Sequence, residues 1–243
     1  DKAVTDFEYA LSAIYPEYLP SGYIESIDGA VTSSKIYTYD IYGNITSEKD
    51  LATGTMIQYE YYTKGTEDFT YAKGEVKSEK VYLIDENGNL VNSTPISSSD
   101  TTFTYNLASD NAYKTVTVTE TAAETVTTTV TVYDVAGRIM SEEITSSKAG
   151  QEGSRESHTY TYDSFGRVIS SVTETAKLDS FGNEIEGTLL TTSETKTYNG
   201  NGSIVSETGT DGITKSYAYD ALNRVVSMTT SKGSLSQTET FTY

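Results

Sequence analysis

The sequence has no cysteine, no tryptophan, one histidine and only three prolines. The absence of cysteine excludes disulfide bonds and thiolate metal sites. No apolar run approaches the about 20 residues of a membrane-spanning helix, so we expect no membrane insertion. Basic residues are also scarce, because 17 Lys and Arg stand against 35 Asp and Glu, which gives a net charge of −18. This charge repels phosphate backbones, and we therefore expect no nucleic-acid partner.

Tyrosine is the most informative residue that the chain does contain. There are 21 tyrosines, although only 36% of all residues are hydrophobic. Aromatic and β-branched residues fit the pleated, half-buried surface of a sheet. The composition therefore predicts an all-β chain whose sheet has one apolar face built largely from Tyr, rather than a thick two-sided core.

One short stretch predicts the local structure of the whole chain. Residues Tyr160 to Val168 read Tyr-Thr-Tyr-Asp-Ser-Phe-Gly-Arg-Val. An Asp at the start of a type I turn accepts backbone N–H bonds, and a Gly three residues later supplies the positive φ of a bulged three-residue hairpin. This turn places Tyr162 opposite Val168 on one face of the sheet and Asp163 opposite Arg167 on the other.

The motif recurs along the chain. Its predicted turn residues are Asp40, Gly43, Asp85, Gly88, Asp134, Gly137, Arg138, Asp163, Gly166, Arg167, Asp220, Asn223 and Arg224. Asn223 replaces Gly at the position where Asn is the tolerated substitute. The copy that begins at Leu178 has its aliphatic residue, Ile185, one position late, which predicts a local change of register. We expect the Asp-x-x-Gly turns to line one edge of the sheet and more variable turns to line the other.

The first twenty residues have a different pattern. Val4, Phe7, Leu11 and Ile14 recur at helical spacing behind a capping-box signature. We predict a short amphipathic helix over residues 5–15 that acts as an N-terminal cap within residues 1–20. Residues 21–243 are then a single β-sheet domain of repeated units. A poorly ordered terminus is the alternative interpretation.

The number of predicted strands limits the shape of the sheet. Open sheets of more than roughly ten strands curl or split. We therefore predict an antiparallel hairpin meander that forms a strongly curled sheet or partial shell. The strands at its ends expose unpaired backbone groups, so association through edge strands is expected.

No catalytic, cofactor or metal site emerges from the sequence, and we expect a protein that is not an enzyme. His158 is the only histidine, lies on a predicted strand and lacks a nucleophile-elbow motif, which favours a structural role. Residues 85–89 resemble the start of a calcium loop but lack its closing Glu, so the repeat turn explains them better. An acidic hydrolase remains an alternative, and it would need two carboxylates that converge in a deep cleft.

Large apolar residues occupy the middle of several turns. They are Tyr42, Phe165, Phe181 and Leu222. We expect them to pack against the neighbouring turn. The alternative is an exposed aromatic edge on which Tyr42, Phe165 and Phe181 stack against a sugar.

The motif at Tyr160–Val168 resembles the YD-repeat, or Rhs-repeat, family, with close matches at residues 37–45 and 217–225. The likeness covers roughly residues 30 to 243. It implies a ribbon of β-hairpins that spirals into a hollow shell. Such repeats occur in secreted or surface-bound bacterial polymorphic toxins, insecticidal toxin complexes, cell-wall-associated proteins and animal teneurins, and carbohydrate binding has been suggested for them.

These observations lead to one functional expectation and one alternative. We expect a non-enzymatic scaffold, extracellular or on a bacterial cell surface after cleavage of a leader, that encloses or presents a cargo or partner protein. The chain begins at Asp1 without an initiating Met, which is consistent with such processing. The alternative is a module that binds carbohydrate or another surface ligand, with glycans as its partners.

Overall fold

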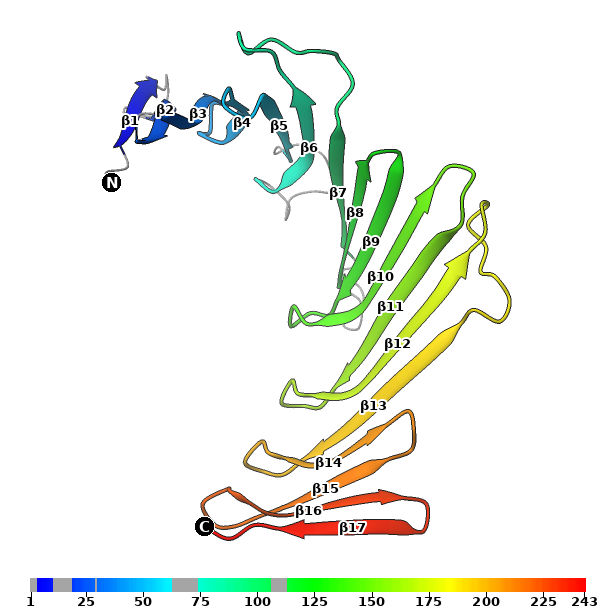
Figure 1. Ribbon diagram of the computed structural model, residues 1–243. Helices are drawn as coiled ribbons and strands as arrows, with labels where there is room; N and C mark the ends of the chain where they lie inside the picture. Colours follow the sequence, from blue (N-terminus) through cyan, green and yellow to red (C-terminus); the bar gives the residue numbers. More distant parts are fainter. Residues whose placement is uncertain (1–3, 11–18, 29, 63–73, 106–112) are drawn as a thin grey trace. The chain divides into compact units, whose positions relative to one another are not determined.

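The computed structural model describes residues 4–10, 19–28, 30–62, 74–105 and 113–243, and its elements are β-strands (Figure 1). In chain order they are β1 (Val4–Ala10), β2 (Leu19–Ile27), β3 (Ala30–Tyr39), β4 (Ile45–Asp50), β5 (Thr55–Tyr61), β6 (Val76–Leu83), β7 (Ser97–Tyr105), β8 (Lys114–Ala122), β9 (Thr125–Tyr133), β10 (Ile139–Lys148), β11 (Gly153–Tyr162), β12 (Val168–Leu178), β13 (Leu190–Tyr198), β14 (Ile204–Gly209), β15 (Thr214–Tyr219), β16 (Val225–Lys232) and β17 (Leu235–Thr240).

Each strand pairs with the next one along the chain. The pairing is antiparallel from β1 through β7 and from β10 through β17, and β7, β8, β9 and β10 are neighbours in the same order. The predicted all-β hairpin meander is therefore confirmed. None of the described residues forms a helix with the length and apolarity needed to cross a membrane. The curling into a partial shell remains a prediction.

The predicted N-terminal helix is wrong for the part of it that is described. Val4–Ala10 is strand β1 and pairs with β2, with Phe7 opposite Tyr23. The rest of the predicted helix, residues 11–15, lies outside the described residues. The helical spacing of four apolar residues is a weak signal, and a strand that satisfies the free edge of β2 gains a full set of backbone hydrogen bonds.

The predicted hairpin geometry is correct. Tyr162 lies opposite Val168, the N–H of Asp163 donates to the carbonyl of Arg167 at 3.0 Å, and the N–H of Gly166 donates back to the carbonyl of Asp163. Gly166 has φ 81°, and Asn223 takes the same left-handed conformation with φ 62° in its own turn. A residue with positive φ therefore closes this hairpin whether it is Gly or Asn.

The prediction that the Asp-x-x-Gly turns all lie at one edge of the sheet is wrong. In a meander, successive turns alternate between the two edges. The turn that begins at Asp163 joins β11 to β12, whereas the turn at Asp179 joins β12 to β13 and lies at the opposite edge. The turn at Asp85, between β6 and β7, lies at that second edge too. The local chemistry of the turn closes a hairpin at either edge, so the motif alone carries no information about which one.

The predicted change of register after Leu178 is also absent. Leu178 forms a bridge with Glu184, which is the same spacing that joins Tyr162 to Val168. The N–H of Asp179 bonds to the carbonyl of Asn183 at 2.8 Å, as in the other copies. The turn therefore keeps its geometry, and a Glu simply occupies the position that is aliphatic elsewhere.

By backbone contacts the chain divides into unit 1, residues 1–105 and 116–128, and unit 2, residues 106–115 and 129–243. In unit 1, Met56, Tyr82 and Ile84 form one small buried cluster, with Leu51 packed against it. In unit 2, Ala176 and Leu178 are the buried apolar residues. None of the described side chains is completely removed from solvent, and the repeat residues Tyr162 and Val168 are only half-buried.

The turn at Asn199–Ser203 offers a direct test of the positive-φ requirement. Gly202 has φ 87° with only ordinary contacts around it, while Gly200 has open space and no positive φ. We expect Gly202→Ala to lower the free energy of unfolding by roughly 1–2 kcal/mol, because a Cβ is strained in this conformation. Gly200→Ala is the matched control and should be neutral or stabilising by about 0.4–1 kcal/mol. Urea unfolding of both variants measures this, and equal effects would refute the assignment.

Candidate functional site

The candidate site is a row of turns along one edge of unit 2, which we call the turn row. It consists of the turns that begin at Asp134, Asp163, Asn199 and Asp220, each directly after a Tyr. In the second of these, Oδ1 of Asp163 accepts the backbone N–H groups of Phe165 at 2.9 Å and Arg167 at 3.0 Å. Oδ2 of Asp163 accepts a bond from Nε of Arg167 at 2.7 Å. The carboxylate therefore closes the turn and holds the Arg side chain in one orientation.

The other predicted turn residues have the same arrangement. Arg138 bonds to Asp134 and Arg224 bonds to Asp220, each with Nε at 2.7 Å from Oδ2. In three copies without Arg, the Asn side chain that follows the Gly takes its place. Those pairs are Asn44 with Asp40, Asn89 with Asp85 and Asn183 with Asp179. The Asp85 carboxylate is occupied by these internal bonds, which supports the repeat turn rather than a calcium loop.

A second bulge follows five of the turns, and the sequence did not lead us to expect it. Tyr162 lies opposite Val168, but the next pair is Thr161 with Ser170, so β12 contains one extra residue, Ile169. The same shift occurs at Tyr39, Tyr61, Tyr198 and Tyr219. Such a bulge breaks the alternation of the strand, so that two successive carbonyl groups point the same way.

The hydroxyl group of a later tyrosine satisfies the additional carbonyl. At the end of the chain, the carbonyl of Val226 accepts the N–H of Phe241 at 2.9 Å, and the carbonyl of the preceding Val225 accepts the hydroxyl of Tyr243 at 2.9 Å. The same bond joins Tyr162 to Ile139, Tyr198 to Val168, Tyr219 to Ile204 and, in unit 1, Tyr61 to Ile45. Each of these tyrosines thus ties its hairpin to the turn of the preceding hairpin.

The turn arginines strengthen this link. The guanidinium of Arg138 lies 4.7 Å from the ring centre of Tyr162, that of Arg167 lies 4.6 Å from Tyr198, and that of Arg224 lies 4.5 Å from Tyr243. These distances are typical of cation–π contacts. Each arginine is therefore held by the Asp of its own turn and covers the tyrosine of the next hairpin. We call this Asp–Arg–Tyr arrangement the clasp.

The clasp affects the acidity of its carboxyl groups. Burial alone would raise the pKa of Asp134, but hydrogen bonds from the backbone and side chain of Arg138 outweigh it and hold that pKa below its usual value. The hydrogen bonds from Arg224 lower the pKa of Asp220 in the same way. Because the folded state favours the ionised forms, their stabilising effect is present above the ordinary pKa and is lost as pH falls through the lowered one.

Sequence reasoning found the turns but missed the clasp. The motif places Tyr162 opposite Val168 and Asp163 opposite Arg167, which describes one hairpin but not its link to the next. One feature of the sequence does indicate this link: Tyr rather than Phe stands at the same repeat position, although Phe would pack equally well. These tyrosines are Tyr39, Tyr61, Tyr162, Tyr198 and Tyr219. A hydroxyl that recurs at one repeat position indicates a hydrogen bond.

The apolar residues in the middle of the turns do not pack as predicted. Phe165 is 82% exposed, Phe181 is 88% exposed and Leu222 is 73% exposed, and Tyr42 is exposed as well. Phe165 contacts the guanidinium of Arg167, 4.9 Å from its ring centre. Phe165 and Phe181 belong to turns at opposite edges of the sheet, so they do not form one continuous aromatic row.

His158 lies between a carboxylate and a hydroxyl on β11. Its Nε2 is 3.1 Å from a carboxylate oxygen of Glu156, its Nδ1 is 3.0 Å from the hydroxyl of Thr173, and its ring stacks on Tyr160. The order carboxylate, imidazole and hydroxyl is that of a catalytic triad. However, β11 and β12 pair in regular register around Thr173, so their backbone N–H groups belong to the strand ladder and do not form an oxyanion hole.

Comparison with known proteins supports the repeat assignment. Residues 198–235 match the family model described as RHS Repeat, which confirms the predicted resemblance. The comparison with curated proteins gives no significant match. Among solved structures, a porin-like protein from Bacteroides vulgatus matches with 10% identity and a TM-score of 0.22, over 91% of this chain and 97% of that one. At that score the likeness carries no argument about this chain.

The tyrosine link can be tested by removing one hydroxyl. We expect Tyr162→Phe to lower the free energy of unfolding by about 1 kcal/mol, because it leaves the carbonyl of Ile139 without its donor. Tyr160→Phe, two residues away on the same strand face, removes a hydroxyl for which the described contacts include no hydrogen bond and should have little effect. Urea unfolding measures both changes. Equal losses would show that the bond to Ile139 contributes nothing particular.

The carboxylate of the clasp predicts a dependence on pH. Asp134→Asn should destabilise the protein more at pH 7 than near pH 3, because the stabilisation from ionised Asp134 begins to be lost once the pH falls below the ordinary pKa of Asp. Asp211→Asn is the control, since the Asp211 carboxylate accepts the N–H of Ile213 and the described ion pairs do not include it. Denaturant midpoints at the two pH values check this. A loss for Asp134→Asn that does not change with pH would contradict the role of the charge.

Proposed function

Starting from the RHS repeat at residues 198–235, we propose that this chain is a non-enzymatic scaffold of the YD-repeat type, which supports, encloses or presents another protein. The observation that carries the proposal is the clasp. The Asp carboxylate, the Arg guanidinium and the Tyr hydroxyl are the polar groups that the repeat supplies. The Asp holds the Arg of its own turn, and the Arg and the Tyr hydroxyl bind one hairpin to the next. The signature residues thus stabilise the ribbon and are not free for chemistry.

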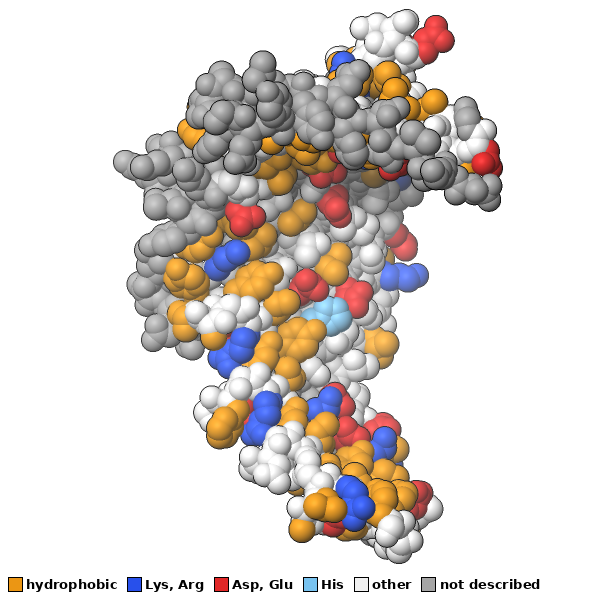
Figure 2. Space-filling model, turned by 90° about the vertical axis from the view of Figure 1, so that its left-hand side faces the viewer, with side chains coloured by type: hydrophobic (Ala, Val, Ile, Leu, Met, Phe, Trp, Pro, Cys, Tyr) orange, Lys and Arg blue, Asp and Glu red, His pale blue; other side chains and the backbone are white. Residues whose placement is uncertain are grey.

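A scaffold role also agrees with the weak internal core. A single-layer sheet has two solvated faces and cannot depend on a thick apolar interior. In unit 2 the sheet displays hydrophobic side chains interleaved with Lys and Arg side chains (Figure 2). A surface of this mixed kind suits contact with another protein.

We place the proposed scaffold outside the cell or on a bacterial cell surface. RHS repeats occur in secreted and cell-surface proteins, and the net charge of −18 without cysteine is compatible with such an environment. A cargo or partner protein is the proposed occupant of the sheet. We propose no catalytic role, because the His158 arrangement lacks oxyanion donors and lies on a regular ladder of paired strands.

Protease treatment of intact cells tests this proposal. On an immunoblot with antibodies against the chain, we expect the protein from source cells to be found in the medium, or to be degraded when protease is added to intact cells. A cytoplasmic protein probed on the same blot should stay intact and serves as the control. A chain that is protected until the cells are lysed would contradict a surface or secreted scaffold.

The exposed turn residues favour a second candidate function, a carbohydrate- or surface-ligand-binding module. Phe165 and Phe181 are almost fully exposed, which is unusual for Phe and is suitable for stacking on a sugar ring. A glycan array separates the two functions: binding that is lost in Phe165→Ala or Phe181→Ala, but kept in the control Leu222→Ala, would establish the second. The scaffold alone predicts no loss of glycan signal in any of the three variants.

A further inference from the structure

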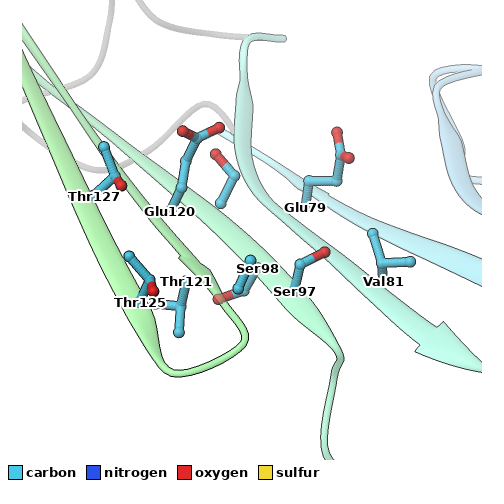
Figure 3. Close-up of a pocket in the computed structure, with 10 residues that line it drawn as sticks. Glu79, Val81, Ser97, Ser98, Glu120, Thr121, Thr125 and Thr127 are labelled. Carbon is cyan, nitrogen blue, oxygen red and sulfur yellow. The ribbon is translucent and has the colours of Figure 1, made fainter. Parts of the chain in front are cut away.

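Unit 1 contains a hollow of about 300 Å³ over strands β6 to β9 (Figure 3). Its lining is rich in hydroxyl groups, with three consecutive serines of β7, Ser97, Ser98 and Ser99, and threonines from the β8–β9 hairpin. Glu79 and Glu120 also line it, and Lys and Arg do not. The hollow is distinct from the turn row, because all of its residues belong to unit 1.

The two carboxylates flank the serines. Glu79 comes from β6 and Glu120 from β8, the strands on either side of β7, and their side chains extend to the same side of the strands in Figure 3. Two strand spacings separate their backbones by about 10 Å. Ser99 is the direct partner of Glu79 in the ladder, so its hydroxyl shares the face from which Glu79 projects.

The negative charge of this hollow has no internal counter-ion among the described residues. The ion pairs described in unit 1 join Lys35 to Glu48 and Lys77 to Glu60 and include neither Glu79 nor Glu120. Lys80 follows Glu79 in the chain and therefore projects to the opposite face of the sheet. Glu79 also lies opposite Tyr59 in the ladder between β5 and β6. The pKa of Tyr59 is raised, mainly by burial and next by the negative charge of Glu79.

We propose that this hollow binds a hydroxylated ligand that carries ammonium groups, such as an oligosaccharide with free amino groups. An ammonium group offers three donors and a positive charge to a carboxylate. Serine and threonine hydroxyls both donate and accept, which suits the hydroxyl groups of a sugar. An anionic ligand would be repelled by Glu79, by Glu120 and by the charge of the whole chain.

Isothermal titration at pH 6 and low salt, with three probes, tests the ligand class. The probes are a glucosamine oligomer, the N-acetylated oligomer of the same length and spermidine. We expect the glucosamine oligomer to bind at least about tenfold more tightly than either of the others, because only it combines the ammonium groups with the hydroxyl groups. Equal binding of the N-acetylated oligomer or of spermidine overturns the proposal, and so does the absence of binding by all three.

Substitutions assign the binding to this hollow. Glu79→Gln and Glu120→Gln preserve the shape of each side chain and should each weaken binding of the glucosamine oligomer by about tenfold. Glu25→Gln removes the same charge from an exposed position of unit 1 and should change the affinity by less than about twofold. Equal effects of all three variants would mean that only net charge matters, and would overturn the site. The scaffold role does not depend on this result, because the cell-surface experiment fails or succeeds separately.

Discussion

The bond from a tyrosine hydroxyl to a bulge carbonyl of the preceding hairpin is the interaction on which the sheet depends. A bulge leaves a backbone carbonyl without a strand partner, and an unpaired carbonyl is costly wherever water is excluded. The repeat tyrosine satisfies this carbonyl from the next hairpin, as Tyr198 does for Val168. The defect that the bulge creates thus becomes the point at which two hairpins are joined.

This link matters because, apart from the backbone ladder, the sheet has little else to hold its hairpins together. The described core consists of small clusters such as Met56 with Tyr82 and Ile84, and no described side chain is fully buried. An ion pair on a sheet surface contributes little by itself. In the clasp, however, Arg167 is bonded to Asp163, donates to the carbonyl of Asn199 and covers the ring of Tyr198, so several modest contacts act on one side chain.

The two units achieve the same connection with different residues. All four arginines of the sequence belong to unit 2, whereas unit 1 has Asn44 and Asn89 at the corresponding turn positions. Unit 1 contains small apolar clusters instead. Its turn that begins at Asp85 is joined to β4 by a hydrogen bond, because Lys49 donates to the carbonyl of Gly88 at 2.8 Å. In unit 2, the corresponding turn at Asp179 is followed by Glu184, which pairs with Arg155 at 2.6 Å.

The sequence by itself determined the features that depend on neighbours in the chain. An Asp followed three residues later by Gly or Asn has one favourable backbone path, so the hairpin, its register and the positive φ of Asn223 were all predictable. The all-β meander followed from the repetition of this unit. The spacing of Val4 and Phe7, in contrast, suggested a helix, because local periodicity contains no information about the open edge of β2.

Only the tertiary structure decided which edge each turn occupies, where the second bulge falls and what the tyrosine hydroxyls bind. These features depend on residues of different hairpins, such as Tyr162 and Ile139, whose distance in space is set by the strand order. The exposure of Phe165 and the position of Glu79 and Glu120 around one hollow are of the same kind. The physical reason is that a turn is closed by short-range steric and hydrogen-bond preferences, whereas contact between hairpins exists only once the whole ladder has formed.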